Sequence, residues 1–356
     1  MTGILARYIT SQSAGAMLRV SLVLVGLYVS VDLVREAADL GEGYGVPEML
    51  LYLLRTAPAR LYDLFPFAIL IGGVIALGRL NASQEAVAMR ACGFHRWRIV
   101  SHSLAAALVL VGLVMAAGEW LVPALETQAR IERERARTGQ VGMAPGQQLW
   151  VRDGPFMIRA GLLIQNDFEQ VGFTGLRFYE LDADGQLQRL ILASGASHRN
   201  GFWHLFEARR LDLKSGSLSA AESEFIVQSE LSPDVFRALA TRPRLLPLSD
   251  IIEIRRYLEA NELDASAYAQ AFWRRLLYPL NALAMLIAGA SFVFKSSRTV
   301  APVIGVFIGV SIGIGFVLVN RIVIGLAPIV PVPMGLIHMV PSVVFAILGS
   351  VLLRRA

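Results

Sequence analysis

The sequence is poor in the residue types from which covalent and metal sites are built. It contains one cysteine, Cys92, so an intrachain disulfide is impossible. Its five histidines are scattered, and no cluster of histidine and cysteine has the spacing of a metal site. We therefore expect neither a metal ion nor another cofactor.

Motifs that mark common catalytic sites are also absent. The chain has no Gly-x4-Gly-Lys-Ser/Thr phosphate loop, no His-Glu-x-x-His zinc motif and no Gly-x-Ser-x-Gly nucleophile turn. The stretch Gly41–Gly45 is rich in glycine, but no strand and helix pattern flanks it, so we interpret it as a plain loop. The sequence predicts a chain that is not itself an enzyme.

Charged residues are scarce, at 17% of the chain, whereas a soluble domain has about a quarter. The net charge of +5 does not indicate nucleic acid, because the basic residues form no stripe with interleaved aromatics. Hydrophobic residues make up 55% of the chain and gather into runs of about 20, the length that crosses a hydrocarbon core of roughly 30 Å. Six transmembrane helices are predicted, at about Ala14–Val34, Leu53–Gly78, Ile99–Val122, Leu276–Phe294, Val300–Ile324 and Met334–Leu353.

The orientation of these spans follows from the basic residues in the short loops, which favour the cytoplasmic side. One set of alternate loops and both ends carries most of them: Arg7, Arg19, Arg79, Arg90, Arg96, Arg98, Lys295, Arg298, Arg354 and Arg355. The first loop of the other set is acidic, with Glu36, Asp39, Glu42 and Glu48 against Arg35 and Arg55. We therefore predict that both termini are cytoplasmic and that the long insertion after the third span lies outside.

This insertion begins with a charged stretch that continues the third span as a helix, and then changes to a strand pattern between Gln147 and Leu231. Short segments rich in aromatic and branched residues are typical of strands: Leu149–Val151, Phe156–Ile158, Leu176–Leu181, Leu190–Leu192, Phe202–Phe206 and Glu224–Gln228. Asp184-Gly185 and Asn200-Gly201 are hairpin signals between them. The pattern indicates a sandwich or a jelly roll.

Helical patterns return after the strands, from Asp250 to about Ala260 with Ser249 as N-cap, and from Ala265 into the fourth span. The predicted fold is an α-helical membrane protein with six transmembrane helices and an inserted, all-β, jelly-roll-like domain. Residues 1–125 would hold three spans, residues 126–274 the inserted domain with its connecting helices, and residues 275–356 the last three spans.

The second cytoplasmic loop, Leu80–Phe94, carries a short helical pattern. Ser83 is a good N-cap, Glu85 suits the first turn, and Gly93 is well placed to end the helix. One interpretation is an amphipathic turn that rests on lipid headgroups. The other is a coupling helix that docks in a groove of a cytoplasmic ATPase subunit, where Glu85 pairs with an arginine. Glu85, Arg90 and Gly93 are therefore candidate ATPase-coupling residues.

Charged residues also lie near the outer ends of the first three spans: Asp32, Arg35, Arg55, Asp63 and Glu119. Charges at such depth usually face protein or a water-filled cavity, so they either pair with one another or line a cavity that faces anionic headgroups. Arg130 and Arg133 follow the third span and would suit phosphorylated sugars, although the interleaved glutamates equally suit a self-neutralised helix. Glycines of the fifth span, Gly305, Gly309 and Gly313, favour close helix packing over a gate.

Motifs along the whole chain resemble the LptF/LptG family of lipopolysaccharide export permeases. They occur in order and at the family's spacing: Ala6–Ile9, Gly41–Tyr44, Leu64–Pro66, Leu77-Gly78, Glu85–Phe94, Gly118–Trp120, Tyr257–Asn261, Tyr268, Trp273, Arg274 and Pro279. Gly41–Tyr44 and Tyr257–Asn261 favour the LptG branch, with the LptF branch as the nearest alternative. A membrane-anchored hydrolase or scaffold would need a nucleophile or metal cluster in the inserted domain, and the sequence shows none.

The resemblance implies a Gram-negative inner-membrane permease that does not hydrolyse ATP itself. Its implied partners are an LptF-like paralogue, a dimer of the ATPase LptB, LptC, and lipopolysaccharide drawn from the membrane toward a periplasmic bridge. In the family the coupling-helix glutamate, here Glu85, contacts LptB, and the first and fifth spans form lateral gates. A family lysine that meets substrate phosphate corresponds to Asp32 here, so that contact is not carried over and Arg35 is the candidate to replace it. Asp32, Arg35, Arg55, Arg130 and Arg133 are the candidate substrate-path residues.

Overall fold

The computed structural model describes the chain with several gaps. The described residues are 2–41, 43–138, 149–153, 155–163, 172–182, 186–199, 202–213, 216–219, 222–228, 243–261, 263–295, 302–326 and 332–355. The chain divides into two compact units. We call Met1–Ala38, Leu53–Leu125 and Gln270–Ala356 the helical unit, and Asp39–Tyr52 with Glu126–Ala269 the sheet unit.

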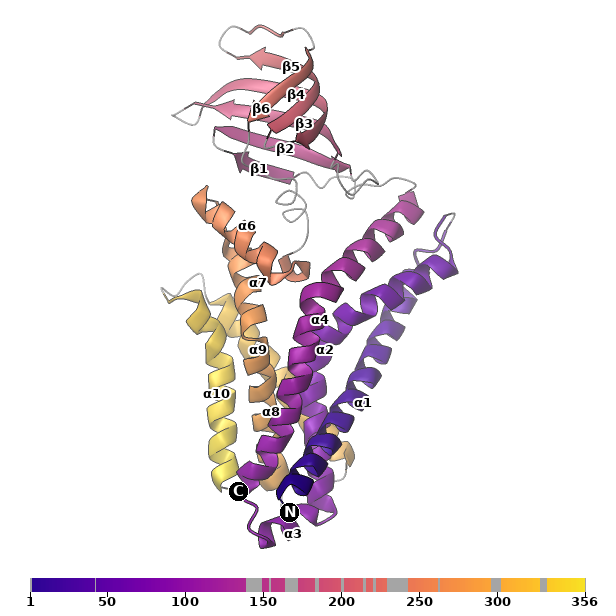
Figure 1. The fold of residues 1–356 in the computed structure, drawn as a ribbon, viewed down its shortest axis with the longest axis vertical. Coiled ribbons are helices and arrows are strands. Elements are labelled where there is room, and N and C mark those ends of the chain that lie inside the picture. Colours follow the sequence, from indigo (N-terminus) through magenta and orange to yellow (C-terminus); the bar gives the residue numbers. More distant parts are fainter. Residues whose placement is uncertain are drawn as a thin grey trace. The chain divides into compact units, whose positions relative to one another are not determined.

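Long helices of apolar residues build the helical unit (Figure 1). They are α1 (Thr2–Ala37), α2 (Val46–Ala82), α4 (Arg96–Thr138), α9 (Pro302–Gly325) and α10 (Met334–Arg355). All five are long and apolar enough to cross a membrane. A sixth candidate is the pair α7 (Ser266–Leu276) and α8 (Tyr278–Lys295), which passes the same test together and is bent by 53°. Five of the six predicted spans are confirmed as helices that could cross a membrane, and the fourth predicted span corresponds to this bent pair.

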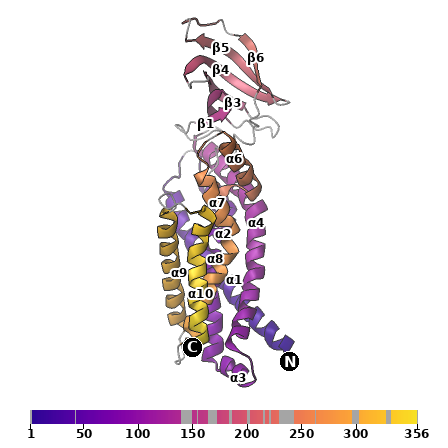
Figure 2. The same ribbon diagram turned by 90° about the vertical axis from the view of Figure 1, so that its left-hand side faces the viewer.

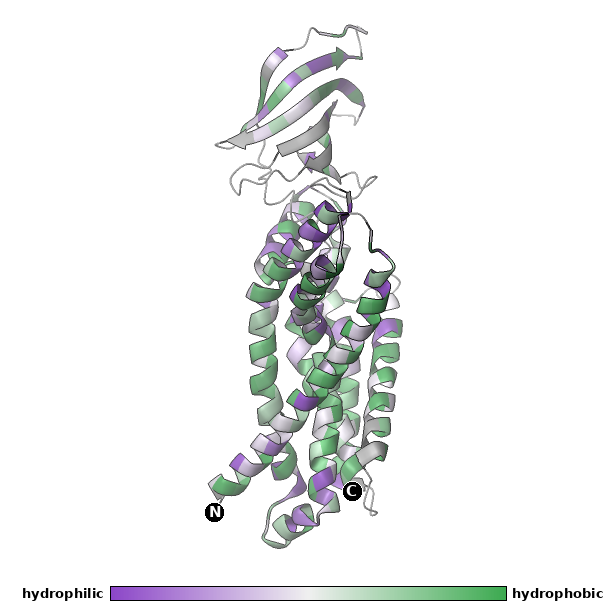
Figure 3. Ribbon diagram, turned by 90° about the vertical axis from the view of Figure 1, so that its right-hand side faces the viewer, coloured by the Kyte–Doolittle hydropathy of each residue, from purple (hydrophilic) through white to green (hydrophobic). Residues whose placement is uncertain are grey.

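Both ends of the chain lie at the same end of the helical unit (Figure 2), where the short helix α3 (Glu85–Ala91) also lies. Apolar residues run along the middle of the long helices (Figure 3). Many of their large apolar side chains are exposed, such as Leu22 and Val34 on α1 and Phe307 on α9. Such an apolar exterior suits contact with lipid or with another apolar helix.

Small residues let the helices of this unit approach closely. A Cβ atom on Gly72 of α2 would lie 2.5 Å from the Cα of Met17, and one on Gly349 of α10 would lie 2.8 Å from the Cα of Ala288. On α9, Gly309 and Gly313 face Ile71 and Phe67 of α2, with Cβ distances of 3.1 and 3.0 Å. Gly309 and Gly313 therefore serve helix packing, as predicted for this span.

The sheet unit contains one antiparallel sheet of six described strands. They are β1 (Leu149–Asp153), β2 (Phe156–Leu163), β3 (Gly172–Leu181), β4 (Leu187–Arg199), β5 (Phe202–Asp212) and β6 (Glu222–Gln228). Every predicted strand segment lies in one of them. Neighbours in the sheet are neighbours in sequence, so the described strands form an up-and-down meander. A jelly roll combines two Greek keys in two sheets, and the described strands do not have that order. The predicted turns Asp184-Gly185 and Asn200-Gly201 lie outside the described residues.

One face of the sheet carries the apolar core of this unit. Ile191 of β4 lies opposite Phe178 of β3, and both are buried. On β5 the buried residues are Trp203, Leu205 and Ala208, so the alternation of buried and exposed residues shifts by one position after Leu205. Glu207, between the last two, has a φ of 51°, in the left-handed region. This local irregularity explains why the sequence alternation of β5 is imperfect.

Helix α6 (Leu248–Ala260) packs three apolar side chains inward and contacts the sheet. Ile251, Ile254 and Leu258 are buried, and Tyr257 packs against the sheet core and donates a hydrogen bond to the carbonyl of Arg152 in β1. The predicted N-cap at Ser249 is wrong, because the helix begins at Leu248 after a 3-10 turn at Pro243–Leu245 and Pro247. The Ser249 hydroxyl instead contacts Asp250 at 2.9 Å.

Candidate functional site

Helix α3 joins α2 to α4 and presents a mixed surface. Ala86 and Met89 are buried in an apolar cluster with Ile9, Leu80 and Phe94, which fixes the helix on the bundle. Val87 and Arg90 are exposed. The apolar side of α3 therefore packs on its own chain, whereas a face with charged and apolar groups remains accessible.

The prediction is correct for the C-terminal end of α3 and wrong for its N-terminal end. Gly93 ends the helix as predicted: its φ is 88°, its N–H donates to the carbonyl of Arg90 at 3.0 Å, and the N–H of Phe94 donates to Met89 at 2.9 Å. The predicted N-cap at Ser83 is wrong. Gln84 occupies that position with a φ of 60°, and α2 continues so far that the Ser83 hydroxyl bonds to the carbonyl of Arg79.

Glu85 is partly buried, and its carboxylate accepts a hydrogen bond from a neighbouring hydroxyl. Ser83 donates to Glu85 Oε1 at 2.9 Å. The partly exposed carboxylate can therefore accept a further cation.

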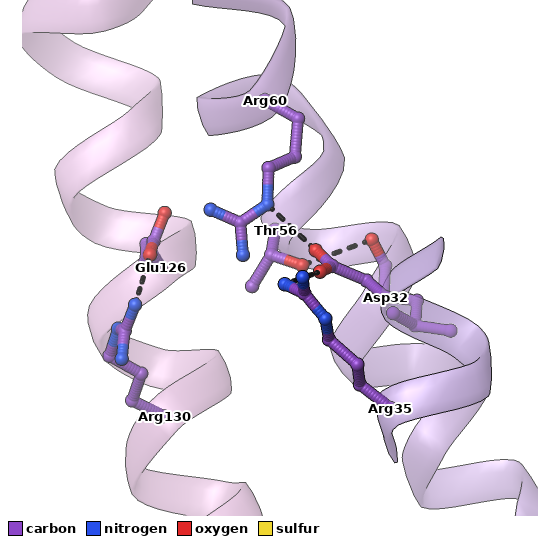
Figure 4. Close-up of polar contacts among 7 residues, drawn as sticks. Asp32, Arg35, Thr56, Arg60, Glu126 and Arg130 are labelled. Atoms are coloured by element: carbon purple, nitrogen blue, oxygen red, sulfur yellow. Dashed lines mark hydrogen bonds and ion pairs between the residues drawn. The ribbon is translucent and has the colours of Figure 1, made fainter. Parts of the chain in front are cut away.

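Asp32 is the centre of an ion-pair cluster between α1 and α2 (Figure 4). Arg60 Nε donates to Asp32 Oδ2 at 2.9 Å, and each of these side chains is only 12% exposed. The Arg60 guanidinium also lies 5.1 Å from the centre of the Tyr28 ring. Arg35 Nη1 lies 3.8 Å from Asp32 Oδ1 and is 71% exposed. Two arginines therefore share the Asp32 carboxylate.

Two other candidate substrate-path residues, Arg55 and Arg130, also interact with neighbouring groups. Arg55 is partly buried and has interactions of its own. On α4, Arg130 Nη2 contacts Glu126 Oε1 at 2.6 Å, an i,i+4 pair whose carboxylate is 1% exposed (Figure 4). The interpretation that these charges pair with one another is the one that the geometry favours.

Arg133 holds the loop between α1 and α2 against α4 within the sheet unit. Its Nη2 contacts Asp39 Oδ2 at 2.7 Å, and its guanidinium lies 5.9 and 5.3 Å from the ring centres of Tyr44 and Tyr52. The glycine-rich stretch is a loop, as predicted, and it has a defined place. Gly43 has a φ of 93°, and a Cβ there would lie 2.6 Å from the carbonyl oxygen of Ala136, so glycine is required.

Two consecutive arginines near the bend between α7 and α8 join three helices of the helical unit. Arg275 contacts Glu119 of α4 at 2.8 Å and is 10% exposed, whereas Arg274 contacts Asp63 of α2 at 3.2 Å and is 60% exposed. The predicted charges Asp63 and Glu119 therefore have cationic partners. Among the described residues, no group of three His, Cys, Asp or Glu side chains could hold a metal ion.

Long apolar helices with ion pairs between them, and an inserted antiparallel sheet, define a polytopic helical membrane protein. The sequence model of the family described as "Lipopolysaccharide export system permease LptF/LptG" matches residues 7–355. The chain belongs to this family, and it is a permease subunit of the lipopolysaccharide export system.

Two curated relatives are each named "Lipopolysaccharide export system permease protein LptG". The protein of Haemophilus influenzae is 27% identical over 359 residues, which cover 100% of this chain and 99% of the relative. The protein of Escherichia coli K12 is 28% identical over 361 residues, which cover 99% and 98%. These comparisons confirm the predicted family and support its LptG branch.

Sequence reasoning missed two residues that the structure places in these clusters. Arg60 could have been found, because it is a basic residue inside the second apolar run. Arg275 follows Arg274, which drew attention only as part of a motif.

Proposed function

We propose that this chain is the non-catalytic permease subunit through which a partner ATPase drives lipopolysaccharide out of the bacterial inner membrane. The observation that carries the proposal is the family match over residues 7–355, which spans both apolar halves and the insertion. In this proposal residues 1–125 and 275–356 form the membrane part. Residues 126–274 form the periplasmic domain, and both termini are cytoplasmic.

The proposed partners are an LptF-like paralogue, a dimer of the ATPase LptB, and LptC. The apolar exteriors of α1 and α9 support a partner within the membrane, because exposed apolar helices pack well against other helices. The chain itself supplies no phosphate loop, so ATP hydrolysis is assigned to the partner.

Glu85 is the proposed contact with the ATPase, and Arg90 and Gly93 shape the same element. The exposed Arg90 and the partly exposed Glu85 lie at the two ends of α3, with Val87 exposed between them. A partner groove with an arginine could bind this surface by the helix-in-groove mode. Gly93 ends the helix and so fixes its length.

The substrate path is proposed to pass the outer ion pairs, with Asp32, Arg35, Arg55, Arg130 and Arg133 as its candidates. Arg35 is the best placed of them, since its side chain is 71% exposed and its carboxylate partner is shared with Arg60. Arg130 and Arg133 would have to exchange a carboxylate for a phosphate, because each is already paired. We propose Arg60 as a further member of this set, because it shares the Asp32 carboxylate with Arg35.

Reversing the charge of Glu85 tests the coupling role. A charge-assisted hydrogen bond contributes about 1.5–3 kcal/mol, so Glu85→Arg should reduce ATPase co-purification by more than tenfold, and Glu85→Gln should have a smaller effect. Glu253→Arg on α6 is the matched control, since it makes the same charge change outside α3. Co-purification and lipopolysaccharide release that are unchanged in Glu85→Arg would refute the role of this residue.

A further inference from the structure

The two faces of the sheet in the sheet unit differ in charge. One face, the core face, carries the apolar core, which includes Val151, Ile158, Phe178 and Ile191. Successive side chains of a strand point to opposite faces, so the residues that alternate with these four lie on the other face, which we call the open face. The strand register places ten described residues there in two neighbouring rows, and none of these ten is buried.

The two rows of the open face are rich in arginine and aromatic residues. The first row crosses β1 to β5 as Trp150, Arg159, Arg177, Leu192 and Arg209. The second row, beside it, contains Arg152, Tyr179 and three apolar side chains. These two described rows therefore hold four arginines and no acidic residue.

Arg159 and Arg177 are direct cross-strand neighbours, although like charges in this position destabilise a sheet. Neither of them, nor Arg209, forms an ion pair with a residue that the structure describes. The Arg159 guanidinium lies 5.8 Å from the centre of the Trp150 ring. An anion bound between the two neighbouring arginines would remove their repulsion.

Acidic residues of the same sheet are paired on the core face. Glu180 contacts Arg189 at 3.5 Å, and Glu222, in register with a buried alanine, pairs with Arg210. Glu207, the exposed residue at the irregularity in β5, forms no ion pair with any described residue. The positive charge of the open face therefore remains uncompensated within the described part of the sheet.

The spacing of the arginines suits a ligand with more than one anionic group. Neighbouring strands lie about 4.8 Å apart, so Arg159 and Arg177 can bind one phosphate between them through bidentate hydrogen bonds. Arg209 is two strands farther along the row, about 10 Å from Arg177, where it can bind a second anionic group. A single small anion would not use both positions.

A pair of stacked aromatic rings lies beside the arginines. The ring centres of Trp150 and Tyr179 are 5.4 Å apart with 30° between their planes, and Trp150 is 52% exposed. A flat, exposed ring with an apolar body packs well against the C–H face of a sugar. The combination of rings and arginines favours a phosphorylated saccharide over a simple anion or an acidic peptide.

We propose that the open face binds the phosphorylated saccharide part of lipopolysaccharide. Arg159 and Arg177 bind one phosphate, Arg209 binds a second anionic group, and Trp150 packs against a sugar ring. The choice of lipopolysaccharide as the source of the saccharide rests on the proposed function. The charge and the rings of the open face are properties of this chain alone, and none of these residues is a substrate-path candidate.

The test measures binding of a soluble probe to the full-length chain, purified with its co-purifying subunits into lipid nanodiscs. The probe is the phosphorylated oligosaccharide that remains after all acyl chains are removed from lipopolysaccharide, and its dephosphorylated form is the reference. Calorimetric titration should show that the probe binds at least about tenfold more tightly than the reference. Its affinity should fall as salt is added, because exposed charges are screened.

Two double variants locate the site on the sheet. Arg159→Gln with Arg177→Gln removes two charge-assisted hydrogen bonds and should weaken binding of the probe at least about tenfold. Arg189→Gln with Arg210→Gln is the matched control, because it removes the same charge from the core face of the same sheet. The affinity of this control should stay within about twofold of the parent, since its arginines do not face the probe.

Two further variants test the geometry and the ring. Arg159→Lys with Arg177→Lys keeps the charge but loses bidentate binding, so it should still weaken binding, and it decides if the glutamine variant does not fold. Trp150→Leu keeps an apolar side chain but removes the flat ring, and it should weaken binding of both the probe and the reference.

Equal losses in the two glutamine double variants would overturn the site, as would equal affinities for the probe and the reference. Unchanged binding in Trp150→Leu would overturn the assignment to a saccharide. Failure of the proposed function is a separate result. In that case the purified complex releases no lipopolysaccharide from its membrane, while the double variants still report whether the open face binds the probe.

Discussion

The adjacent arginines at the bend between α7 and α8 allow a controlled test of how burial sets the strength of an ion pair in this protein. Arg275 and Glu119 are 10% and 29% exposed, whereas Arg274 and Asp63 are 60% and 35% exposed. Removing one partner of a buried pair costs about 3–5 kcal/mol, and an exposed pair contributes about 0–1 kcal/mol. Because Glu119 retains some exposure, we expect Arg275→Gln to cost about 2–3 kcal/mol and Arg274→Gln less than about 1 kcal/mol.

Equilibrium unfolding of the full chain in mixed micelles would measure both changes. Double-mutant cycles with Glu119→Gln and Asp63→Asn isolate the pair terms, since Arg275 also lies 6.0 Å from the Tyr62 ring and 3.5 Å from the carbonyl of Gly118. The coupling energy should be about 2 kcal/mol for the first pair and below about 0.5 kcal/mol for the second. Equal coupling energies would refute the argument from burial.

Two other predictions concern helix packing and pH. Gly335→Ala would place a Cβ 2.6 Å from the Trp273 ring, so it should destabilise the chain by about 1–3 kcal/mol in the same unfolding assay. Gly315→Ala meets nothing within 4 Å and should be nearly neutral; a similar loss in both would contradict the packing argument. The hydrogen bonds from the backbone and side chain of Ser266 lower the pKa of Asp264 from its ordinary value of 3.8. The charged form therefore stabilises the start of α7 above about pH 4 and loses this effect as the pH falls through the lowered pKa. Protection of the amides of Ser266–Ala269 from hydrogen exchange should decrease at pH values below 4, compared with the protection in an Asp264→Asn variant. A ratio of the two protection factors that stays constant with pH would exclude this contribution.

The features that sequence reasoning predicted are those with a local cause. Apolar runs predict spans because lipid demands about 20 apolar residues, and Gly93 ends α3 because it can adopt a positive φ at no steric cost. The strand segments were found from their aromatic and branched residues. The up-and-down order was not predicted, because strand order depends on pairing beyond the local pattern.

The features that escaped prediction depend on residues far apart in sequence. Asp32 pairs with a residue 28 positions away, and Arg275 with one 156 positions away. Sequence spacing carries no record of such pairs, although charges inside apolar runs indicated that partners would be needed. The N-caps failed for a related reason: extension of α2 and of α6 by a few residues moved Ser83 and Ser249 away from the cap positions.

The up-and-down order of the sheet has a consequence for how the chain acquires its structure during synthesis. Each strand from β2 to β6 pairs with the strand made immediately before it, so no strand waits for a distant partner. Contacts of low sequence separation form quickly, and the sheet can grow strand by strand as the chain emerges. The exception is β1, whose contact with Tyr257 must await α6, more than a hundred residues later. The surroundings of the first strand are therefore completed only after α6 has been made, although its pairing with β2 forms early.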